Sequence, residues 1–511
     1  MKFTFADILA RTAQWSPDKT AFSIGGDSIT YQALLERSRQ VAARLTSYPG
    51  ENVGILLPNS IDWVVCLFGA ALAGKVAVLL NTRLTTQELV YQIDQSDTTV
   101  LITSLLYKRD PDALVTALRQ ECPNCQDIVW QGDTQPDQTT GMRTWLSHTD
   151  ANAVLPMVEE SSRAVIIYTS GTTSLPKGVM LSHYAVVANA LLVGQAFGAT
   201  EQDKVFSAGP FAHSGGLTMH VILSVLYGAT AYSVAHFNPA EVLDVIETEQ
   251  CTIYNGIETL FLRLLDAPGF HRDRVKSIRT GWATGSRSVL HRIADEVGMP
   301  GIVCVYGISE AAPNVTISHH LETVEHRLDT VGTPHPWMRA VVRDPQTGLP
   351  VADGEVGELT VSGYSVMQGY YKNAEETAKA LRNGWLYTGD LVRKRSDGYF
   401  EFAGRSKDII RVGGENVSAL EVEDALHQVY GVAIAAVIPA DDEVYGEVPL
   451  AVIQPVNGIE LQASEIMTAL SQQLASYKLP KRIIFRTDMP LTDSGKVQKR
   501  QLRQLLMESN A

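Results

Sequence analysis

The chain has 511 residues, of which 45% are hydrophobic and 19% charged, and its formal net charge is -14 at pH 7. This composition is typical of a soluble globular enzyme and excludes a largely disordered or fibrous chain. The length exceeds what one hydrophobic core can hold, so we expect two or more domains. The acidic balance repels phosphate backbones at long range, which excludes nucleic acid as a general partner.

The five cysteines do not form a disulfide framework. Cys122 and Cys125 form one C-x-x-C, but nothing nearby completes a redox or zinc site, so we expect two thiols in a polar loop. No stretch approaches the roughly 18 apolar residues of a membrane span, and the N-terminus lacks the apolar core of a signal peptide. We therefore expect a cytoplasmic protein with no integral membrane segment.

Helical and extended patterns alternate through the first half of the chain. Apolar spacing predicts a helix over 31–45 and one through 63–72. Short apolar runs predict buried strands at 53–57 and 76–80, and the pattern recurs at 165–168 and 302–305. Strands that alternate with helices favour parallel sheets covered on both faces.

The pattern changes from about Gly348, where glycine-containing turns separate short strands and indicate a smaller, strand-rich lobe. A different unit follows Gly404, with predicted strands at 408–412, 432–438 and 448–453 and a helix over 464–474. Ser418 and Glu421 have the spacing of a capping box at the start of another helix. We predict an N-terminal domain over 1–406 and a C-terminal domain over 407–511.

The strongest local signal is a loop directly after an apolar strand. Seven residues from Thr169 to Lys177 are hydroxylic, glycine or lysine, so the loop can wrap phosphates with hydroxyls, backbone N–H groups and one positive charge. It is not a Walker A loop, because Pro176 stands where the glycine before the lysine should be. A solvated Ser/Thr loop is the alternative interpretation.

This loop resembles the phosphate loop of the adenylate-forming superfamily, which comprises acyl-CoA synthetases, peptide-synthetase adenylation domains and luciferases. Ser174 replaces the family's second glycine. The resemblance implies an α/β fold: a large N-terminal domain of stacked mixed β-sheets with helices and a strand-rich lobe, and a small mobile α+β C-terminal domain. It also implies that ATP contacts the following loop residues: Thr169, Ser170, Gly171, Thr172, Thr173 and Lys177.

Further motifs follow in the family's order. Tyr306-Gly-Ile-Ser-Glu310 resembles Y-G-x-T-E, which implies that Tyr306 lies near adenine, Ser309 at the phosphates and Glu310 on Mg²⁺. Tyr387-Thr-Gly-Asp390 resembles T-G-D, whose carboxylate accepts the ribose hydroxyls. Either motif alone could be a turn, so their weight comes from the order of the whole set.

The C-terminal motifs imply a moving domain. Arg405 would contact the ribose or phosphate, Lys407 would be the hinge, and Gly413 and Gly414 would line the entry channel for a thiol. Lys496, in a segment that resembles P-x-T-x-x-G-K, would reach the α-phosphate and the carboxylate.

The chemistry that the resemblance implies explains these residue types. A carboxylate attacks the α-phosphorus of ATP and pyrophosphate leaves, so catalysis depends on positioning and on stabilising negative charge. The sequence has no G-x-S-x-G elbow, and this mechanism needs no protein nucleophile. In the second step a thiolate attacks the acyl carbonyl and releases AMP, which requires Lys496 to withdraw.

The segment Phe211-Ala-His-Ser-Gly-Gly216 resembles the family's substrate-side motif. Ala212 stands where amino-acid-activating relatives place an aspartate, which argues against an α-amino acid. His213 resembles the gating aromatic or histidine near the substrate carboxylate, and a structural histidine is the alternative. Trp282 stands where a glycine is usual; its indole either shortens the pocket or packs in the core. We expect the acyl pocket to comprise Ser214, Gly215, Trp282, Ala283, Gly307 and Ala311.

The predicted activity is that of an AMP-forming acyl- or aryl-CoA ligase that takes a short- or medium-chain, or compact aryl, acid and uses ATP, Mg²⁺ and coenzyme A. The alternative acceptor is the phosphopantetheine of an acyl carrier protein. A local excess of basic residues over 478–503 could receive either acceptor or be a solvated face. A non-catalytic nucleotide sensor would lack Glu310 or Lys496, and nothing positive indicates a luciferase-like oxygenase. The sequence indicates neither the acid nor an oligomeric state.

Overall fold

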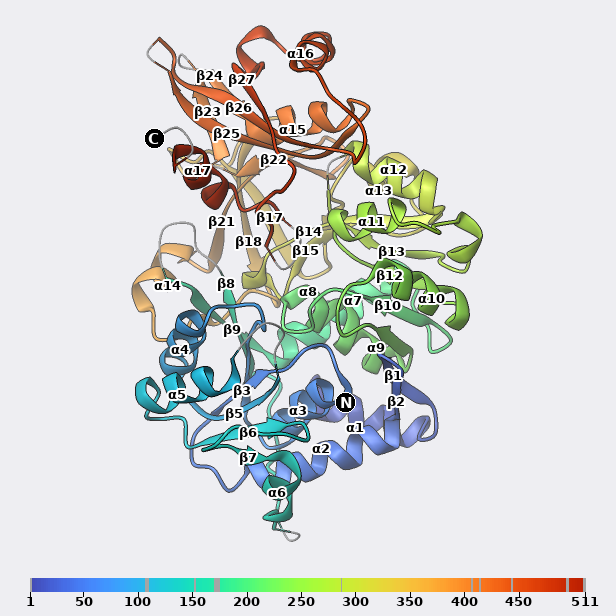
Figure 1. Ribbon diagram of the computed structural model, residues 1–511, viewed down its shortest axis with the longest axis vertical. Helices are drawn as coiled ribbons and strands as arrows, with labels where there is room; N and C mark the ends of the chain where they lie inside the picture. The colour runs from blue at the N-terminus through green and yellow to red at the C-terminus, as the bar shows by residue number, and fades with distance from the viewer. Residues whose placement is uncertain are drawn as a thin grey trace.

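The fold comprises two large β-sheets whose strands are interleaved along the chain, a strand-rich lobe and a smaller C-terminal unit (Figure 1). The structure is a computed structural model that describes residues 2–105, 110–150, 153–169, 175–285, 287–405, 408–412, 415–442, 444–492 and 496–508. The blue N-terminal half lies at one end of the long axis in Figure 1, and the orange to red C-terminal unit lies at the other.

Within the described residues, the first large sheet has nine strands and the second has eight. The nine-stranded sheet runs in the order β16 (Thr333–Pro334), β15 (Asn314–Ile317), β14 (Gly301–Gly307), β13 (Thr280–Ala283), β12 (Ile253–Asn255), β10 (Lys204–Ser207), β11 (Thr230–Ser233), β1 (Thr20–Ile24) and β2 (Asp27–Thr30). The eight-stranded sheet runs in the order β19 (Gly369–Tyr370), β9 (Lys177–Ser182), β8 (Arg163–Thr169), β4 (Val76–Leu79), β3 (Asn52–Leu56), β5 (Thr98–Ser104), β6 (Asp127–Gln131) and β7 (Thr140–Gly141). Both sheets are parallel at their centres and antiparallel at one or both edges.

Two five-stranded sheets complete the described fold. The lobe contains β17 (Met338–Arg343), β18 (Val356–Gly363), β21 (Trp385–Lys394), β20 (Leu381–Arg382) and β22 (Phe400–Arg405). The C-terminal sheet contains β24 (Glu415–Ser418), β23 (Ile409–Val412), β26 (Gly446–Pro455), β25 (Val432–Asp442) and β27 (Arg482–Phe485).

Helices connect these strands. In the N-terminal half they are α1 (Phe5–Trp15), α2 (Tyr31–Leu45), α3 (Ile61–Leu72), α4 (Thr86–Gln95), α5 (Pro111–Glu121), α6 (Met142–Ser147), α7 (His183–Phe197), α8 (Ser214–Gly216), the π-helix η1 (Leu217–Ile222), α9 (Leu223–Tyr227) and α10 (Pro239–Glu249). Those that follow are α11 (Glu258–Leu265), η2 (Arg272–Arg274), α12 (Arg287–Val297), η3 (Ser309–Ala311), α13 (Val324–Leu328), α14 (Ala374–Ala380), α15 (Ala419–His427), α16 (Ala463–Ser471), η5 (Ser476–Lys478) and α17 (Lys499–Glu508).

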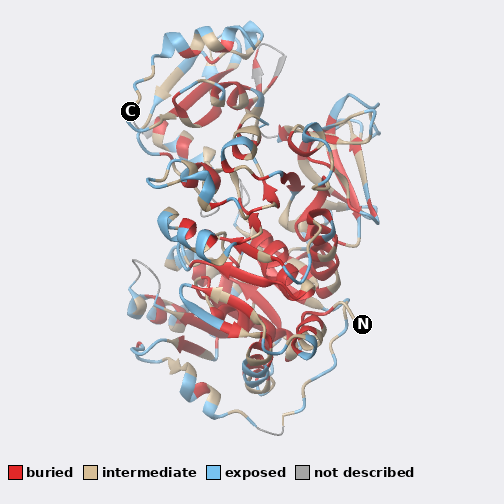
Figure 2. Ribbon diagram, turned by 90° about the vertical axis from the view of Figure 1, so that its right-hand side faces the viewer, coloured by how far each residue is buried: buried red, intermediate tan, exposed pale blue. Residues whose placement is uncertain are grey.

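The main core lies between the two large sheets, where Figure 2 shows buried residues concentrated. Strand β4 shows how the two faces of a sheet divide, because successive side chains of a strand point to opposite faces. Ala77 and Leu79 join the main core, which includes α3 and α7, whereas Val76 and Val78 pack with α4 and α5 on the outer face. A parallel sheet is thus covered on both faces, as the apolar runs predicted.

The C-terminal sheet has cores of its own. Apolar side chains of β23, β25 and β26 pack with α15 and α16 on one side, and those of β25 and β26 pack with α17 on the other. The predicted boundary between residues 406 and 407 falls outside the described residues and stays a prediction. Among the described residues, no helix has both the length and the apolar character needed to cross a bilayer.

Most predicted elements are confirmed within a residue or two, but two local predictions are wrong. Ser418 precedes α15 without capping it, because its hydroxyl donates a hydrogen bond to the carbonyl of Ala403, 2.7 Å away. Glu421 pairs with Lys478 instead of closing a capping box. Cys122 and Cys125 lie in the loop between α5 and β6, as expected, but the expected polar surroundings are wrong: both thiols are buried in the outer core of the eight-stranded sheet.

Candidate active site

Asp390 lies at the centre of the first group of predicted site residues. It is buried in β21, directly opposite Arg405 of β22, and Arg405 Nε lies 3.0 Å from Asp390 Oδ1. Tyr306, at the end of β14, donates its hydroxyl to Asp390 Oδ2 at 2.7 Å, and its ring stacks on Phe402 with centroids 5.9 Å apart. Burial first, and then the charge of Asp390, raise the pKa of Tyr306 well above its usual value. The hydrogen bond between Tyr306 and Asp390 joins the nine-stranded sheet to the lobe.

Lys496 of the C-terminal domain lies within electrostatic range of His213 of the N-terminal domain. Both side chains reach solvent, yet the surrounding protein desolvates them. This desolvation, followed by the charge of Arg405, lowers the pKa of Lys496, and Asp390 acts in the opposite direction. Desolvation and then the charge of Lys496 lower the pKa of His213 to about 4, so the imidazole is neutral near pH 7. The C-terminal domain therefore brings a cation to this group.

The orientation of His213 follows from a local contact. Its Nδ1 accepts a hydrogen bond from the backbone N–H of Gly215 at 3.2 Å, at the start of α8. A neutral imidazole that accepts at Nδ1 carries its proton at Nε2. His213 therefore has a hydrogen-bond donor at Nε2.

Glu310 and Lys177 form a second group with Tyr370 and Glu376. Tyr370 donates its hydroxyl to Glu310 Oε1 at 2.9 Å, and its ring lies 4.6 Å from Lys177 Nζ. Lys177 Nζ pairs with Glu376 Oε2 at 2.9 Å. Lys379 first, and then Lys177, hold the pKa of Glu376 at about 2. The residues that the sequence assigned to phosphate and metal thus lie together.

Ser214 and Ser309 connect the predicted acyl and nucleotide residues. Their hydroxyls are 3.2 Å apart and share a hydrogen bond. Beside them, a Cβ on Gly215 would lie 3.5 Å from His213 Nδ1 and 3.7 Å from Trp282 Cζ2. Trp282 is buried, and its indole Nε1 has no hydrogen-bond partner among the described residues. Gly215 thus lies beside the indole, and the nearest neighbour of such a Cβ would be Met219 Cε at 3.3 Å.

The other predicted site residues fall into three sets. Thr169 is the last residue of β8 and pairs with Lys177, the first residue of the antiparallel strand β9. Ala283 and Ala311 are fully buried, and Gly307 ends β14, with Ile308 between it and Ser309. The following predicted residues lie outside the described part of the chain: Ser170, Gly171, Thr172, Thr173, Lys407, Gly413 and Gly414.

Tyr370 and Glu376 were not predicted from the sequence. Glu376 is 199 positions from Lys177 along the chain, so no local pattern links them. The run Gly369-Tyr-Tyr-Lys372 contains a glycine and two tyrosines, which is a weak signal. Only the pairing of β19 with β9 brings this run to the lysine.

The donor set fits a magnesium ion that binds together with ATP. Among the described residues, no group of three or more His, Cys, Asp or Glu side chains could hold a metal ion by itself. Mg²⁺ commonly binds one or two carboxylates together with substrate phosphates rather than an all-protein cage. Glu310 supplies one carboxylate beside Lys177 and Ser309, which suits that mode of binding.

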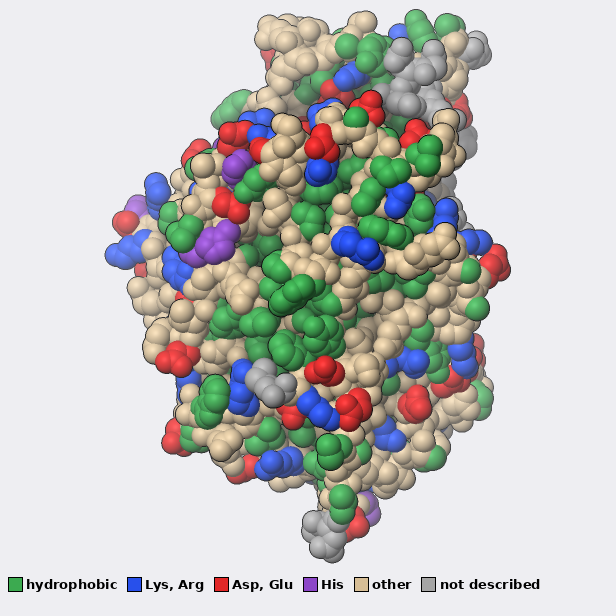
Figure 3. Space-filling model, turned by 180° about the vertical axis from the view of Figure 1, so that it is seen from behind, with side chains coloured by type: hydrophobic (Ala, Val, Ile, Leu, Met, Phe, Trp, Pro, Cys, Tyr) green, Lys and Arg blue, Asp and Glu red, His purple; other side chains and the backbone are tan. Residues whose placement is uncertain are grey.

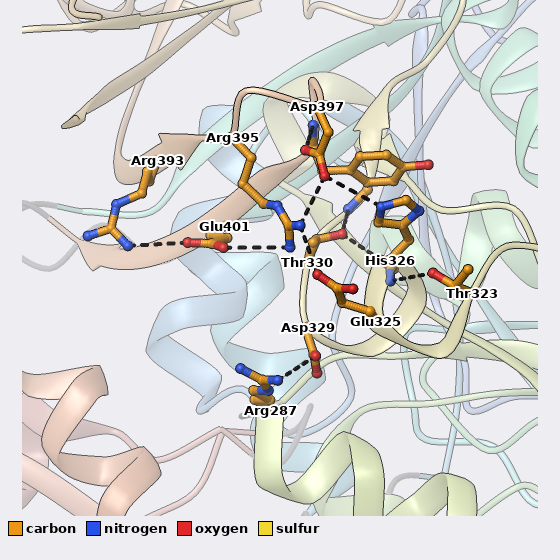
Figure 4. A network of polar contacts seen from close by, with 12 residues as sticks. Arg287, Thr323, Glu325, His326, Asp329, Thr330, Arg393, Arg395, Asp397 and Glu401 are labelled. Carbon is orange, nitrogen blue, oxygen red and sulfur yellow. Dashed lines mark hydrogen bonds and ion pairs between the residues drawn. The ribbon is translucent and has the colours of Figure 1, made fainter. Parts of the chain in front are cut away.

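The β21–β22 hairpin, which carries the buried aspartate and its arginine, is held by a polar network (Figure 4). Arg395 Nη2 lies 2.8 Å from Glu325 Oε1 of α13 and 2.9 Å from Asp397 Oδ2. His326 lies 3.5 Å from the same carboxylate and stacks on Tyr399 with centroids 3.9 Å apart. These contacts fix the hairpin against the large domain.

Comparison with known proteins extends over the whole chain. A family model described as AMP-binding enzyme matches residues 9–371, and one described as AMP-binding enzyme C-terminal domain matches residues 421–496. The chain is 32% identical to a feruloyl-CoA synthase of Amycolatopsis sp, over 96% of this chain and 97% of that protein. It is 31% identical to a long-chain-fatty-acid–CoA ligase of Bacillus subtilis (strain 168), over 98% of this chain and 94% of that protein. Its fold matches the crystal structure of the anthranilate CoA ligase AuaEII in complex with anthranoyl-AMP, with a TM-score of 0.92 and 25% sequence identity. The match covers 100% of this chain and 99% of that one.

Proposed function

The chain belongs to the family of AMP-binding enzymes and is an AMP-forming acyl- or aryl-CoA ligase, and from this premise we propose which residues carry each step and which acids it accepts. The observation that supports the assignment most is the approach of Lys496, from the C-terminal domain, to His213, Asp390 and Arg405 of the N-terminal domain. A cation at this place suits the first half-reaction, in which the carboxylate of the acid has to approach the triphosphate of ATP.

In that half-reaction, a carboxylate oxygen of the acid attacks the α-phosphorus of ATP, and the bond to pyrophosphate breaks. Lys496 stabilises the negative charge on the α-phosphoryl and carboxylate oxygens, and Lys177 binds the leaving pyrophosphate. Asp390 accepts the ribose hydroxyls in place of part of its present pairing with Tyr306 and Arg405. Bound Mg²⁺ would supply further charge neutralisation on the phosphate oxygens, held by Glu310.

His213 is suited to orient the acid rather than to take a proton. A carboxylate that attacks phosphorus is already ionised at neutral pH, so no base is needed. The neutral imidazole donates from Nε2, and this N–H can fix the second carboxylate oxygen. We therefore assign His213 to positioning the nucleophile.

In the second half-reaction, the sulfur of coenzyme A attacks the acyl carbonyl and AMP leaves. Lys496 then has to move away, so that Gly413 and Gly414 can line the thiol channel. Part of the basic segment over 478–503 is already paired within its own domain: Lys478 with Glu421, and Lys499 with Glu423. These pairs leave less free positive charge both for an acidic carrier protein and for the phosphates of coenzyme A.

For the acid, we propose a short- or medium-chain or compact aryl carboxylate that carries a hydrogen-bond acceptor. Trp282 lies against Gly215 and takes up volume that a glycine at its own position would leave open. Its buried Nε1–H has no partner among the described residues, and an unpaired buried donor costs free energy. An acceptor atom on the bound acid could satisfy it.

The assignment is tested by ATP–pyrophosphate exchange with a panel of carboxylic acids, followed by product analysis after coenzyme A is added. We expect Mg²⁺-dependent exchange with compact acids, and AMP with an acyl-CoA as products. ADP and phosphate as products would contradict the mechanism. A thioester formed on a carrier protein but not on coenzyme A would contradict the acceptor.

The pocket assignment is tested by Trp282→Gly. Loss of the indole should raise kcat/KM for longer acids, with each additional buried methylene worth roughly 0.8 kcal/mol. It should also cost about 3–5 kcal/mol of stability, because Trp282 is buried. The melting temperature and the chain-length profile are measured on the same variant, and lower stability with an unshifted profile would remove Trp282 from the pocket.

A further inference from the structure

One short segment, residues 367–371, touches both predicted halves of the triphosphate site. The backbone N–H of Met367 donates to the carbonyl of Glu310 at 2.8 Å. Gln368 N donates to the carbonyl of Met180, and Tyr371 N donates to that of Gly178, both on β9, which begins at Lys177. The segment therefore bridges the chain that carries the predicted metal ligand and the strand that carries the phosphate-loop lysine.

Tyr370 is the residue of this segment whose side chain contacts both groups. Its hydroxyl donates to Glu310 Oε1 at 2.9 Å, and the face of its ring lies 4.6 Å from Lys177 Nζ. The first contact fixes the plane of a carboxylate, and the second restrains a flexible ammonium by cation–π attraction. One rigid ring thus sets the position of the carboxylate and of the lysine relative to each other.

The tyrosine itself has little freedom to move. Strand β19 pairs with β9 at Gly369↔Met180 and Tyr370↔Val179, and Tyr370 N donates to Thr377 Oγ1 at 2.9 Å. Gly369 has φ +132, and a Cβ there would lie 2.9 Å from Thr377 Cγ2, so this approach requires glycine. The side chain is 6% exposed. These contacts place the ring before any ligand arrives.

We propose that Tyr370 is a positioning residue for the magnesium–ATP complex, which orients Glu310 through its hydroxyl and Lys177 through its ring. The inference rests on the proposed function, because it takes Glu310 and Lys177 to be the groups that meet the triphosphate. Residues that orient a metal ligand from behind typically alter metal affinity as strongly as many direct contacts do. The hydroxyl and the ring have separable roles.

Two substitutions separate these roles, and a third is the matched control. Tyr370→Phe removes the hydroxyl and keeps the ring beside Lys177, whereas Tyr370→Leu removes both contacts. Tyr371→Phe makes the same chemical change at the adjacent residue, whose hydroxyl donates to Asp97 Oδ2 at 2.8 Å. The melting temperature and the affinity for AMP without metal show whether each variant is folded with an intact nucleoside site.

The measurement is calorimetric binding of a non-hydrolysable ATP analogue, with and without Mg²⁺, to the full-length protein. The ratio of the two affinities gives the enhancement by magnesium. We expect Tyr370→Phe to lower this enhancement about tenfold and to keep the metal-free affinity. Tyr370→Leu should lower both the enhancement and the metal-free affinity, because Lys177 loses its contact with the ring as well and keeps its ion pair with Glu376. Tyr371→Phe should match the wild type.

Three results would overturn the inference, and they are distinguishable. If the wild type shows magnesium enhancement and Tyr370→Phe keeps all of it, the hydroxyl does not position Glu310, and the proposed function is unaffected. If the wild type binds no ATP analogue and catalyses no pyrophosphate exchange, the proposed function itself fails. Loss of AMP binding in both Tyr370 variants, but not in Tyr371→Phe, would show that Tyr370 supports the whole site rather than its metal end, which also overturns the inference.

Discussion

At the scale of single residues, surroundings decide what each ionisable group can do. Lys496 and His213 both reach solvent, but each lies where desolvation and a neighbouring cation disfavour its positive charge. A bound triphosphate reverses that effect for the lysine, because it supplies the anion that the free site lacks. We therefore expect ATP binding to stabilise the charged form of Lys496 more than it would stabilise that of a lysine on the open surface.

Replacing Lys496 with alanine should affect one half-reaction much more than the other. Adenylation should fall by about 10²–10³, because one electrostatic stabiliser of the transition state is lost. Thioester formation from preformed acyl-adenylate should change far less. The control is Lys481→Ala, an exposed lysine of the same basic segment. Equal losses in both half-reactions would show that the lysine does not withdraw.

His220 gives a prediction about pH. It is buried in η1 beside Phe211, and neither ring nitrogen has a partner among the described residues. Burial lowers the pKa of His220 to about 3 from a usual value near 6.5. Below pH 6.5 the imidazole is therefore protonated in the unfolded chain but still neutral in the folded protein. Its contribution to the free energy of unfolding is fully present above that pH and is lost as the pH falls toward 3.

His220→Phe should remove this dependence. Between pH 7.5 and pH 5 the wild type should lose about 2 kcal/mol more stability than the variant. Denaturant unfolding at the two pH values measures the difference, and the same substitution at the exposed His148 is the control. If both variants follow the wild type, protonation of His220 does not contribute to acid unfolding.

At the scale of elements, the β21–β22 hairpin is the piece that joins the two domains. The network of Figure 4 anchors its turn to α13, while its other end carries Arg405 and leads into the C-terminal domain. Gly404 has φ +122, and a Cβ there would lie 3.0 Å from Ser418 Oγ. The hydroxyl of Ser418 bonds to Ala403 of the hairpin, so this serine links the domains instead of capping α15.

Ser418→Ala should weaken the arrangement in which the domains meet. Loss of one hydrogen bond costs about 1 kcal/mol, so adenylation should fall severalfold at most. Thioester formation from preformed acyl-adenylate should stay the same or increase. Ser471→Ala is the control, because that hydroxyl bonds within α16 to the carbonyl of Thr468. A parallel fall of both half-reactions would contradict a role at the joint.

At the scale of the whole molecule, we expect the two half-reactions to use two arrangements of the same chain. The described arrangement brings Lys496 to the large domain, which suits adenylation. In the space-filling view of Figure 3, basic and acidic side chains are interspersed, and hydrophobic ones gather near the middle of that face. Neither sign of charge dominates the face shown.

Lys407→Pro should hinder the change between the two arrangements. Proline fixes φ near -65° and removes a backbone donor, which restricts rotation at the predicted hinge. Adenylation should survive, and thioester formation should fail. The two half-reactions are measured separately on the purified variant, and unchanged overall turnover would show that the hinge lies elsewhere.

The sequence by itself determined the elements, the family and the chemistry. Helix 31–45 follows from the spacing of its apolar residues, because burial on one face imposes a period, and the strands near 53, 76, 165 and 302 follow from short apolar runs, because a covered parallel sheet buries both faces. The ordered motifs predicted roles for Lys177, Glu310, Asp390 and Lys496, because each motif is a continuous run of residues. Apolar spacing and continuous motifs are local features, so they can be recognised without a structure.

Only the tertiary structure decided which distant residues meet. The pairing of β19 with β9 brings Tyr370 between Lys177 and Glu310, and Glu376 reaches the lysine across 199 positions of sequence. The capping prediction at Ser418 failed for the same reason, because a partner from another strand outcompeted the local one. Contacts of this kind depend on how sheets and domains pack together, and no local pattern of residue types records that packing.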